Sequence, residues 1–352
     1  MIQSLRLQHF RSYRDDSFEF EAGVNIVVGP NASGKTNLLE AILLLCQGSS
    51  FRARDTELIS FKAAWARLEA SYSGGHSRVA KLDGRGGPLI KEFIIDDKPF
   101  RRLSLERTFP VVLFEPQHLQ LLVRGPEGRR DYLDDLLARS RAGFKSLANA
   151  YKRTLAQRNS LLKKGRAEAN RQLFAWDVRL SELGGQIAAA RAELVADINK
   201  SIAKTYSQIA RTRSRVAITY QSQFAPDRYS TRLLAKLESS ADTDLALGFT
   251  AYGPHREDFS IELNGHPAAA AASRGETRSL LLALKIYELA RLEKLRGQKP
   301  IFLLDDVFSE LDSARRQALV EHLSGHQTII TTTDADAVIE YFADRHHLIP
   351  LS

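Results

Sequence analysis

Cysteine is nearly absent from the sequence, which contains Cys46 alone among 352 residues. A single thiol excludes an internal disulfide framework, and its place in the apolar run AILLLC at 41–46 predicts a buried thiol rather than a catalytic one. An apolar run of this length is far too short to span a bilayer. The opening MIQSLRLQHF lacks the basic and apolar regions of a secretory signal. These absences predict a cytosolic protein with no membrane partner.

Acidic residues are in the minority: 42 Asp and Glu stand against 50 Lys and Arg, which gives a net charge of +8. Basic proteins often meet nucleic acid, although net charge alone is weak evidence. The positive charge is concentrated between residues 139 and 171, where ten Lys and Arg face Glu168 alone. Such a segment predicts contacts with the backbone of duplex DNA without sequence reading, and a solvated charged face is the alternative. The candidate DNA contacts are Lys152, Arg153, Arg158, Lys163, Lys164 and Arg166.

The order of patterns along the chain predicts an α/β protein in which one lobe is interrupted by another. Strand-like alternation fills the first part, and from about 127 to 212 apolar residues recur with helical spacing and almost no proline. Sheet character then returns with VAITYQS and DFSIELNG. We therefore expect an ATPase lobe at 1–125, an inserted helical lobe at 126–245 and the remainder of the ATPase lobe at 246–352.

The stretch GPNASGKT at 29–36 matches the phosphate-loop pattern and stands between a predicted strand and a predicted helix. Glycines let the backbone wrap around oxyanions, and a helix N-terminus favours negative charge. An ordinary glycine turn is the alternative. The pattern predicts binding of ATP and Mg²⁺, with Lys35 on the outer phosphates and the Thr36 hydroxyl on the metal. The predicted nucleotide contacts are Gly29, Pro30, Asn31, Ala32, Ser33, Gly34, Lys35, Thr36 and Asn37.

Two carboxylates end the apolar strand in IFLLDDVFSELD at 301–312. Asp305 is the predicted Mg²⁺ ligand, directly or through water. Asp306 would stand beside the attacking water as general base or orienting group. A pair of helix-capping aspartates after a core strand is the alternative, and the phosphate loop in the same chain makes it less attractive.

The distance in sequence between Lys35 and Asp305 is much larger than in a simple GTPase or kinase, and it resembles the ABC and SMC class of ATPase heads. In that class a signature turn opens the helix before the acidic strand, where SRGE at 273–276 stands here. The chain more closely resembles the RecF family of bacterial recombination-mediator ATPases. The segments that carry this resemblance, in family order, are HFRSY, GPNASGKTNLLEAI, GSSFR, QRNSLLK, GPHREDF, SRGETRSLLLALKIYE and LLDDVFSELD.

The resemblance implies an ABC/SMC-type head that forms head-to-tail homodimers on ATP. Each ATP would lie between the phosphate loop of one subunit and the signature turn of the other, where Ser273, Gly275 and Glu276 would meet it. Arg11 and Thr333 would approach the nucleotide as well, and for Arg11 a surface arginine is an equally good reading. Asp306 replaces the glutamate of most ABC ATPases, which implies slow hydrolysis that acts as a switch. The resemblance as a whole implies a weak, DNA-stimulated ATPase.

The chain departs from the family pattern at a few positions, which leave Ser273 and Gly275 intact. Arg274 and Thr277 stand where the family usually has glutamine. Near Gln117 the family usually has an acidic residue, so Gln117 and Glu115 both remain candidates for the metal-facing residue after that strand. The role of His255 and Arg256 is open between structure, nucleotide and DNA.

The function that the resemblance implies is ATP-dependent binding of double-stranded DNA near gaps, in DNA replication, recombinational repair and the SOS response. The expected partners are RecO and RecR, with which the protein would help load RecA, and the expected location is the bacterial cytoplasm, on the nucleoid. The alternatives are the ATPase subunit of an ABC transporter and an SMC-like structural tether. A transporter subunit would need a membrane partner, and a tether would need much longer coiled-coil arms.

Overall fold

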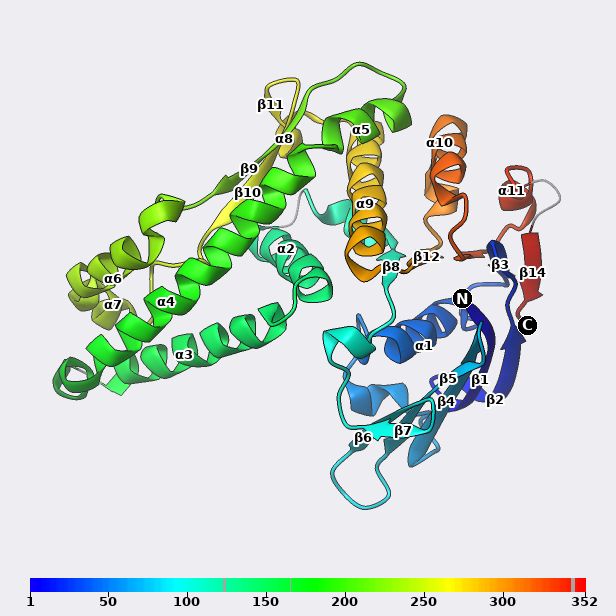
Figure 1. Ribbon diagram of the computed structural model, residues 1–352, viewed down its shortest axis with the longest axis horizontal. Helices are drawn as coiled ribbons and strands as arrows, with labels where there is room; N and C mark the ends of the chain where they lie inside the picture. Colours follow the sequence, from blue (N-terminus) through cyan, green and yellow to red (C-terminus); the bar gives the residue numbers. More distant parts are fainter. Residues whose placement is uncertain (123–124, 165, 343–345) are drawn as a thin grey trace. The chain divides into compact units, whose positions relative to one another are not determined.

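The computed structural model describes residues 1–122, 125–164, 166–342 and 346–352, with only the backbone described for 166–171. The chain divides into two compact units (Figure 1). Unit 1 consists of Met1–Leu119 and Lys285–Ser352, and unit 2 is Gln120–Leu284. In the part of the chain so described, no helix combines the length and the apolar composition that crossing a bilayer requires.

Unit 1 contains a parallel sheet of five strands. Strands covered on both faces read as continuous apolar runs rather than as alternation, and every residue of β8, β12 and β13 is buried. In spatial order the strands are β14 (His346–Pro350), β3 (Val24–Val28), β13 (Thr328–Thr332), β12 (Ile301–Asp305) and β8 (Val111–Phe114).

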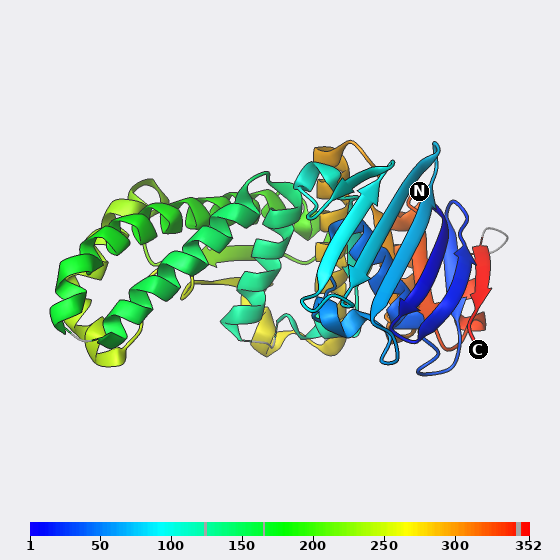
Figure 2. The same cartoon turned by 90° about the horizontal axis from the view of Figure 1, so that it is seen from below.

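A second, antiparallel sheet of six strands completes the sheet structure of unit 1 (Figure 2). Its strands alternate buried and exposed residues, as expected where one face packs on the core and the other faces solvent. In spatial order they are β2 (Tyr13–Glu19), β1 (Ile2–Phe10), β4 (Trp65–Tyr72), β5 (His76–Asp83), β6 (Ile90–Ile95) and β7 (Lys98–Phe100).

Helix α1 (Lys35–Gln47) packs against strands of both sheets of unit 1. Its sequence KTNLLEAILLLCQ is apolar on almost every side, which is the composition of a helix enclosed by other elements. Cys46 is buried at its end, as the sequence predicted. The connections of the unit hold η1 (Asp55–Leu58), η2 (Leu105–Arg107), η3 (Pro116–Gln120), η5 (Phe308–Glu310), α10 (Ser313–Leu323) and α11 (Asp336–Ile339).

Unit 2 is built on the long helices α3 and α4, which pack side by side along their length (Figure 1). Leu162 and Leu173 form a small apolar cluster where the two helices meet, with Leu245 packed against it. The helices of the unit are α2 (Pro126–Ser140), α3 (Phe144–Lys164), α4 (Arg166–Asn199), α5 (Ile202–Ala210), α6 (Tyr229–Ser239), α7 (Ala241–Leu247) and α8 (Ala268–Ala271), with η4 (Pro226–Arg228).

A small antiparallel sheet of unit 2 explains why its boundary differs from the predicted one. Its strands, in the order β11 (His266–Pro267), β10 (Asp258–Leu263) and β9 (Val216–Gln221), tie the segment after residue 246 to the segment before it. Residues 246–284, which the sequence pattern assigned to the ATPase lobe, therefore lie in unit 2. Helix α9 (Arg274–Arg296) begins in unit 2 and ends in unit 1.

Candidate functional site

The loop at residues 29–34 connects β3 to α1 at the carboxyl end of the parallel sheet. A Cβ on Gly29 would lie 2.6 Å from the Ser33 hydroxyl and 2.7 Å from the Leu351 carbonyl, so that only glycine fits. Gly34 has φ 102°, and a Cβ there would lie 2.9 Å from the Tyr13 hydroxyl. Both glycines are thus required by space or by conformation, as a backbone that closely wraps a ligand demands.

Polar groups inside the loop are poised for an anion. The Lys35 ammonium donates to the carbonyls of Gly29 and Pro30, at 2.7 and 2.8 Å, so the side chain folds back over the loop. The Ser33 hydroxyl is buried and makes no hydrogen bond to any described residue. A buried hydroxyl without a partner is costly, and a phosphate oxygen would satisfy it. Among the other predicted contacts, Pro30, Asn31 and Ala32 lie exposed on the loop.

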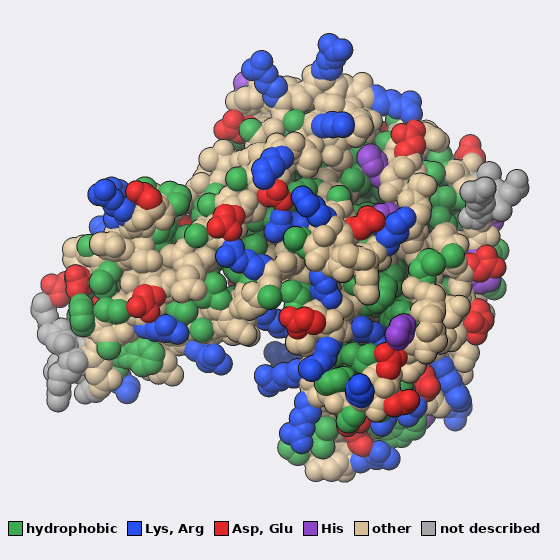
Figure 3. Space-filling view, viewed as in Figure 1, with side chains coloured by type: hydrophobic (Ala, Val, Ile, Leu, Met, Phe, Trp, Pro, Cys, Tyr) green, Lys and Arg blue, Asp and Glu red, His purple; other side chains and the backbone are tan. Residues whose placement is uncertain are grey.

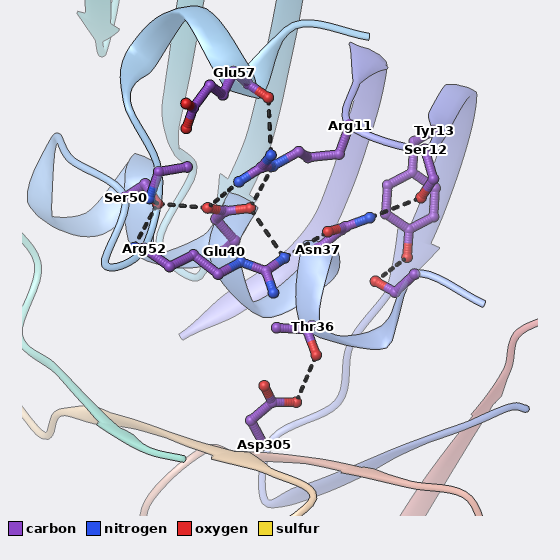
Figure 4. Close-up of polar contacts among 12 residues, drawn as sticks. Arg11, Ser12, Tyr13, Thr36, Asn37, Glu40, Ser50, Arg52, Glu57 and Asp305 are labelled. Atoms are coloured by element: carbon purple, nitrogen blue, oxygen red, sulfur yellow. Dashed lines mark hydrogen bonds and ion pairs between the residues drawn. The ribbon is translucent and has the colours of Figure 1, made fainter. Parts of the chain in front are cut away.

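The Thr36 hydroxyl meets the acidic strand directly. It donates to a carboxylate oxygen of Asp305 over 3.1 Å, and the buried Thr331 hydroxyl donates to the same oxygen over 2.8 Å (Figure 4 shows the Thr36 contact). Strand β13, which carries Thr331, lies between β3 and β12, and this brings the three side chains together. A threonine hydroxyl beside a carboxylate is the hard oxygen ligand set that Mg²⁺ prefers.

Asp306 occupies a strained position at the end of β12. Its φ of 55° is uncommon for a residue other than glycine, and its N–H donates to the Thr331 carbonyl at 3.2 Å and hydroxyl at 3.0 Å. Burial raises the pKa of Asp306, and the negative charges of Asp305 and Glu310 raise it further against the opposing charge of Lys35. A carboxylate with a raised pKa is a better proton acceptor than an ordinary aspartate.

One turn along α1, the fully buried Glu40 organises the neighbouring arginines (Figure 4). Arg11 donates from Nε and Nη2 to the two oxygens of this carboxylate, at 2.7 and 2.9 Å. Arg52 donates to Glu40 over 3.3 Å and to the Asn37 amide oxygen over 2.6 Å. Burial acts to raise the pKa of Glu40, but hydrogen bonds from Arg11 and Ser50 and the charges of both arginines outweigh it and lower that pKa. Arg11 is therefore oriented by Glu40 and only partly exposed, unlike an unpaired surface arginine.

A cavity of about 680 Å³ lies beside this network, entirely within unit 1. Asn37 lines it and donates its amide hydrogen to the Ser12 hydroxyl over 2.9 Å, which anchors the cavity wall to the end of the phosphate loop. The lining residues are Arg11, Ser12, Asn37, Thr56, Glu57, Ile59, Ser60, Phe61, Ala63, Ala64, Gly84, Gly87 and Leu89.

Three further candidate residues follow strands of the parallel sheet at its carboxyl edge. Gln117 is exposed in η3, after β8, and Glu115 is half-buried before it. Thr333 is exposed directly after β13. Their roles toward metal or nucleotide remain predictions.

The signature turn in unit 2 is the N-terminus of α9, with a capping box in place. The Glu276 carboxylate accepts the N–H of Ser273 at 2.8 Å, and the Ser273 hydroxyl accepts the N–H of Glu276 at 3.2 Å. This reciprocal pairing satisfies donors at the helix start and corresponds to the pattern S-x-x-E at 273–276. Gly275, half-buried between them, has no side chain to cover the helix start. Glu276 thus has a structural task that its predicted nucleotide contact did not include.

The predicted DNA contacts divide sharply by exposure. Lys152, Arg153, Lys163 and Lys164 are exposed on α3, whereas the side chain of Arg166 lies outside the described residues. Arg158 is wholly buried, so its prediction as a DNA contact is wrong. It pairs with Asp177 over 2.5 Å and with Asp244 over 2.6 Å. Helical periodicity turned this one arginine of the basic segment inward.

His255 and Arg256 hold unit 2 together. His255 Nε2 lies 3.1 Å from the Thr250 carbonyl, which can only accept, so Nε2 carries the proton and donates. Nδ1 therefore accepts a hydrogen bond from the Tyr151 hydroxyl at 2.7 Å. Burial lowers the pKa of His255 to about 4, which keeps the ring neutral. The Arg256 guanidinium lies over the Phe249 ring at 4.8 Å. These contacts favour a structural role for both residues.

Two residues of the site escaped the sequence patterns. Thr331 orients Asp305 and holds the N–H of Asp306, but a threonine within an apolar strand gives no distinctive signal. Glu40 did have one, because it is an isolated charge inside the apolar helix NLLEAILLLC. A lone carboxylate in such a run predicts a buried partner of opposite charge.

Comparison with known proteins agrees with this architecture. A family model described as the RecF/RecN/SMC N-terminal domain matches residues 1–346. The DNA replication and repair protein RecF of Heliobacterium modesticaldum is 38% identical over 96% of this chain and 93% of its own length. A solved structure of the recombination mediator protein RecF-ATPrS in the RecFOR pathway gives a TM-score of 0.86 at 31% identity, covering 96% of this chain and 94% of that one.

An SMC head bound to the C-terminal winged-helix domain of ScpA gives a TM-score of 0.53 at 16% identity, over 97% of this chain and 92% of that one, and shows likeness of fold alone. The predicted fold class, an α/β head of the ABC/SMC type, is confirmed by these likenesses and by the two sheets of unit 1. The chain belongs to the RecF family within the RecF/RecN/SMC class of ATPase heads.

Proposed function

We propose that this protein is an ATP-operated switch that binds double-stranded DNA in recombinational repair, with weak ATP hydrolysis resetting it. The observation that carries the proposal is the contact of Thr36, next to Lys35 at the end of the phosphate loop, with Asp305 of the distant acidic strand, beside a loop with an unsatisfied buried hydroxyl. The names of the relatives, DNA replication and repair protein and recombination mediator, support the biological setting.

In this proposal the loop at 29–34 and the start of α1 hold the phosphates. Backbone N–H groups, the Ser33 hydroxyl and the Lys35 ammonium supply the donors, and Lys35 exchanges its contacts with Gly29 and Pro30 for phosphate oxygens. The cavity beside Asn37 and Ser12 takes the nucleoside part, because it opens where the loop ends. Arg11 lines that cavity with its charge already oriented by Glu40.

Mg²⁺ would be held by the Thr36 hydroxyl and Asp305, and it would supply charge neutralisation of the phosphate oxygens. Thr331 keeps the Asp305 oxygen in place for this task. Asp306 accepts a proton from the attacking water as the water oxygen bonds to the terminal phosphorus and the bond to the bridging oxygen breaks. The aspartate side chain is short, so we expect slow turnover and a switch rather than a motor.

The dimer of the proposal is head-to-tail. Ser273 and the N–H of Gly275 of the partner subunit would meet the terminal phosphate, with the capping box holding the turn in shape. Hydrolysis removes that phosphate and weakens the interface. Contacts to the phosphate backbone of duplex DNA near gaps come from the exposed Lys152, Arg153, Lys163 and Lys164. DNA binding then stimulates ATP hydrolysis. RecO and RecR are the proposed partners, through which RecA would be loaded on the bacterial nucleoid.

Size-exclusion chromatography with light scattering tests this proposal. The wild-type protein should be monomeric with ADP or without nucleotide, dimeric with ATP and Mg²⁺, and should bind short duplex in the ATP state. Ser273→Arg should retain ATP binding by the monomer but lose the dimer and hydrolysis. Ala270→Arg, exposed on α8 three residues earlier, is the matched control and should dimerise normally.

Two results would contradict the proposal. If the wild-type protein stays monomeric in ATP, the proposed ATP-dependent dimer does not form. A Ser273→Arg variant that no longer binds ATP as a monomer would show that the turn serves its own nucleotide site.

A further inference from the structure

We propose that unit 2 carries a second phosphate-binding surface, formed by Arg213 and Arg215 immediately before β9, which takes the backbone of duplex DNA. The inference rests on the proposed DNA-binding function and names a surface separate from the lysines of α3. It arises from a cavity, an exposed row of arginines and their lack of partners.

The cavity has a volume of about 610 Å³ and lies wholly within unit 2. It is rich in groups that donate hydrogen bonds to phosphate oxygens: guanidinium groups, two serine hydroxyls and an asparagine amide. Glu262 supplies the one carboxylate among the residues that line it. The lining residues are Ser207, Arg213, Ser214, Arg215, Ala217, Glu262, Asn264 and Gly265.

The segment 213–219 presents its arginines on one side. Arg213, Arg215, Ala217 and Thr219 are exposed, whereas Val216 and Ile218 between them are buried. Successive residues of an extended chain point to opposite faces, and residues two apart on one face are separated by about 6.6 Å. The two guanidinium groups thus start from neighbouring points along a line, and each can contact its own phosphate of a strand.

Arg213 and Arg215 differ from the arginines that stabilise unit 2 in having no acidic partner. Arg129, Arg158 and Arg191 each form an ion pair with aspartate, at 2.6, 2.5 and 2.8 Å respectively. Within the described ranges, neither Arg213 nor Arg215 has an ion pair within 4.0 Å, although Glu262 lies on the adjacent strand opposite Ala217. The fold therefore does not use their charges, and they remain available to an external anion.

The backbone at Arg215 and in the strand that follows is held by hydrogen bonds on both sides. The N–H of Arg215 donates to the Asn264 side-chain oxygen at 2.9 Å, and the N–H of Asn264 donates back to the Arg215 carbonyl at 2.8 Å. The outer edge of β9 is closed by Asn199, whose amide group pairs with the N–H and carbonyl of Ile218. A rigid support keeps the donors in place and reduces the entropy lost when a ligand binds.

The arrangement favours a chain of phosphates over a single small anion. Two exposed arginines two residues apart, directly before a strand, match a repeating ligand, and arginine contacts phosphate through two parallel N–H groups. Arg211 adds a third exposed guanidinium just before them, at the end of α5. Figure 3 shows Lys and Arg side chains standing out at the top of the view, over the segment that joins α5 to β9.

Duplex binding measured against salt concentration tests the inference, with ATP and Mg²⁺ present throughout. The double variant Arg213→Ala/Arg215→Ala should reduce the slope of log affinity against log salt by about 1.8, because each phosphate contact contributes about 0.9. The advantage of wild type over the variant should accordingly shrink about tenfold between 50 and 200 mM salt. Arg213→Lys/Arg215→Lys keeps the charges and should restore most of the slope.

A matched control removes two exposed arginines from unit 1. Arg101→Ala/Arg102→Ala changes the net charge equally and should leave the slope within error of wild type. If Arg213→Ala/Arg215→Ala also leaves it unchanged while wild type binds duplex, the inference is wrong and the proposed function stands. If the wild-type protein binds no duplex, both the proposed function and this inference are wrong. If Arg213→Ala/Arg215→Ala weakens ATP binding and the control variant does not, the surface binds nucleotide rather than DNA, and the inference is wrong.

Discussion

Each unit of the molecule contains a charged network around a fully buried side chain, but the two networks differ in the sign of that charge and in enclosure. In unit 1 the carboxylate of Glu40 is 0% exposed, while its partners Arg11 and Arg52 remain 21% and 33% exposed. In unit 2 the guanidinium of Arg158 is 0% exposed, and its partners Asp177 and Asp244 are 3% and 0% exposed. The arginines of the Glu40 network are thus partly in contact with water, whereas all three charges of the Arg158 network are buried.

The difference in enclosure implies a difference in task. Arginines that are partly in water can turn toward a ligand phosphate without leaving a bare charge in the core. A sealed network cannot rearrange, because any broken pair leaves a desolvated charge. We therefore interpret the Glu40 network as part of a responsive site and the Arg158 network as the fixed joint between α3, α4 and α7.

The strongest test of the sealed network is Arg158→Met. It leaves Asp177 and Asp244 buried without their cation, and we expect a loss of about 3–5 kcal/mol in the free energy of unfolding of unit 2. Hydrogen exchange monitored by mass spectrometry would locate the loss in peptides of unit 2. Lys152→Met, exposed on the same helix, should change stability by less than about 0.5 kcal/mol. Equal effects of the two changes would show that the network is not sealed in solution.

Acid should weaken unit 2 through His255. The pKa of His255 is lowered to about 4 in the fold from its ordinary 6.5, so the unfolded chain takes up the proton first as pH falls. The contribution of His255 to the free energy of unfolding is therefore fully present above pH 6.5. It is lost progressively as the pH falls to about 4, by about 3 kcal/mol in total. His255→Gln should remove this pH dependence in urea titrations, whereas His266→Gln, at an exposed position, should keep it.

Glu40→Gln tests the open network and should have a smaller effect. Arg11 and Arg52 keep access to water, so the loss is that of charged hydrogen bonds, about 1–3 kcal/mol in unit 1. Saturating ATP should recover part of the loss if the released arginines contact phosphates, and it should leave the Arg158→Met defect unchanged. If ATP does not reduce the loss of stability in Glu40→Gln, Glu40 has a purely structural role, as Arg158 does.

Asp306→Asn should have the smallest effect on stability and the opposite sign. Because the pKa of Asp306 is raised, its protonated form is favoured in the fold, and that contribution is lost as pH rises through the raised pKa. Replacing the charge should therefore raise the melting temperature at neutral pH by less than about 4 °C, and the gain should vanish in acid. Hydrolysis should be lost at the same time. Glu321→Gln, at an exposed position, should change neither property.

The sequence predicted those parts of the site whose chemistry is contained in a short, continuous stretch. The loop between β3 and α1 and the acidic end of β12 follow from contiguous residues with fixed spacing, and the fold class follows from their order. Arg158 shows the limit of this approach. In the sequence it is one basic residue among ten between 139 and 171, and nothing local separates it from Lys163. Its partner Asp244 is 86 residues away, so only the packed helices decide its burial.

What the sequence by itself determined is thus the glycine loop before α1, the acidic end of β12 and the capped start of α9, because backbone geometry restricts the residues allowed there. Tertiary structure alone decided which charges face water. It set Thr331 between two distant motifs, enclosed Arg158 with two aspartates, and left Arg213 and Arg215 without partners. Burial and pairing depend on contacts between segments far apart in the chain, and no local pattern of residues specifies them.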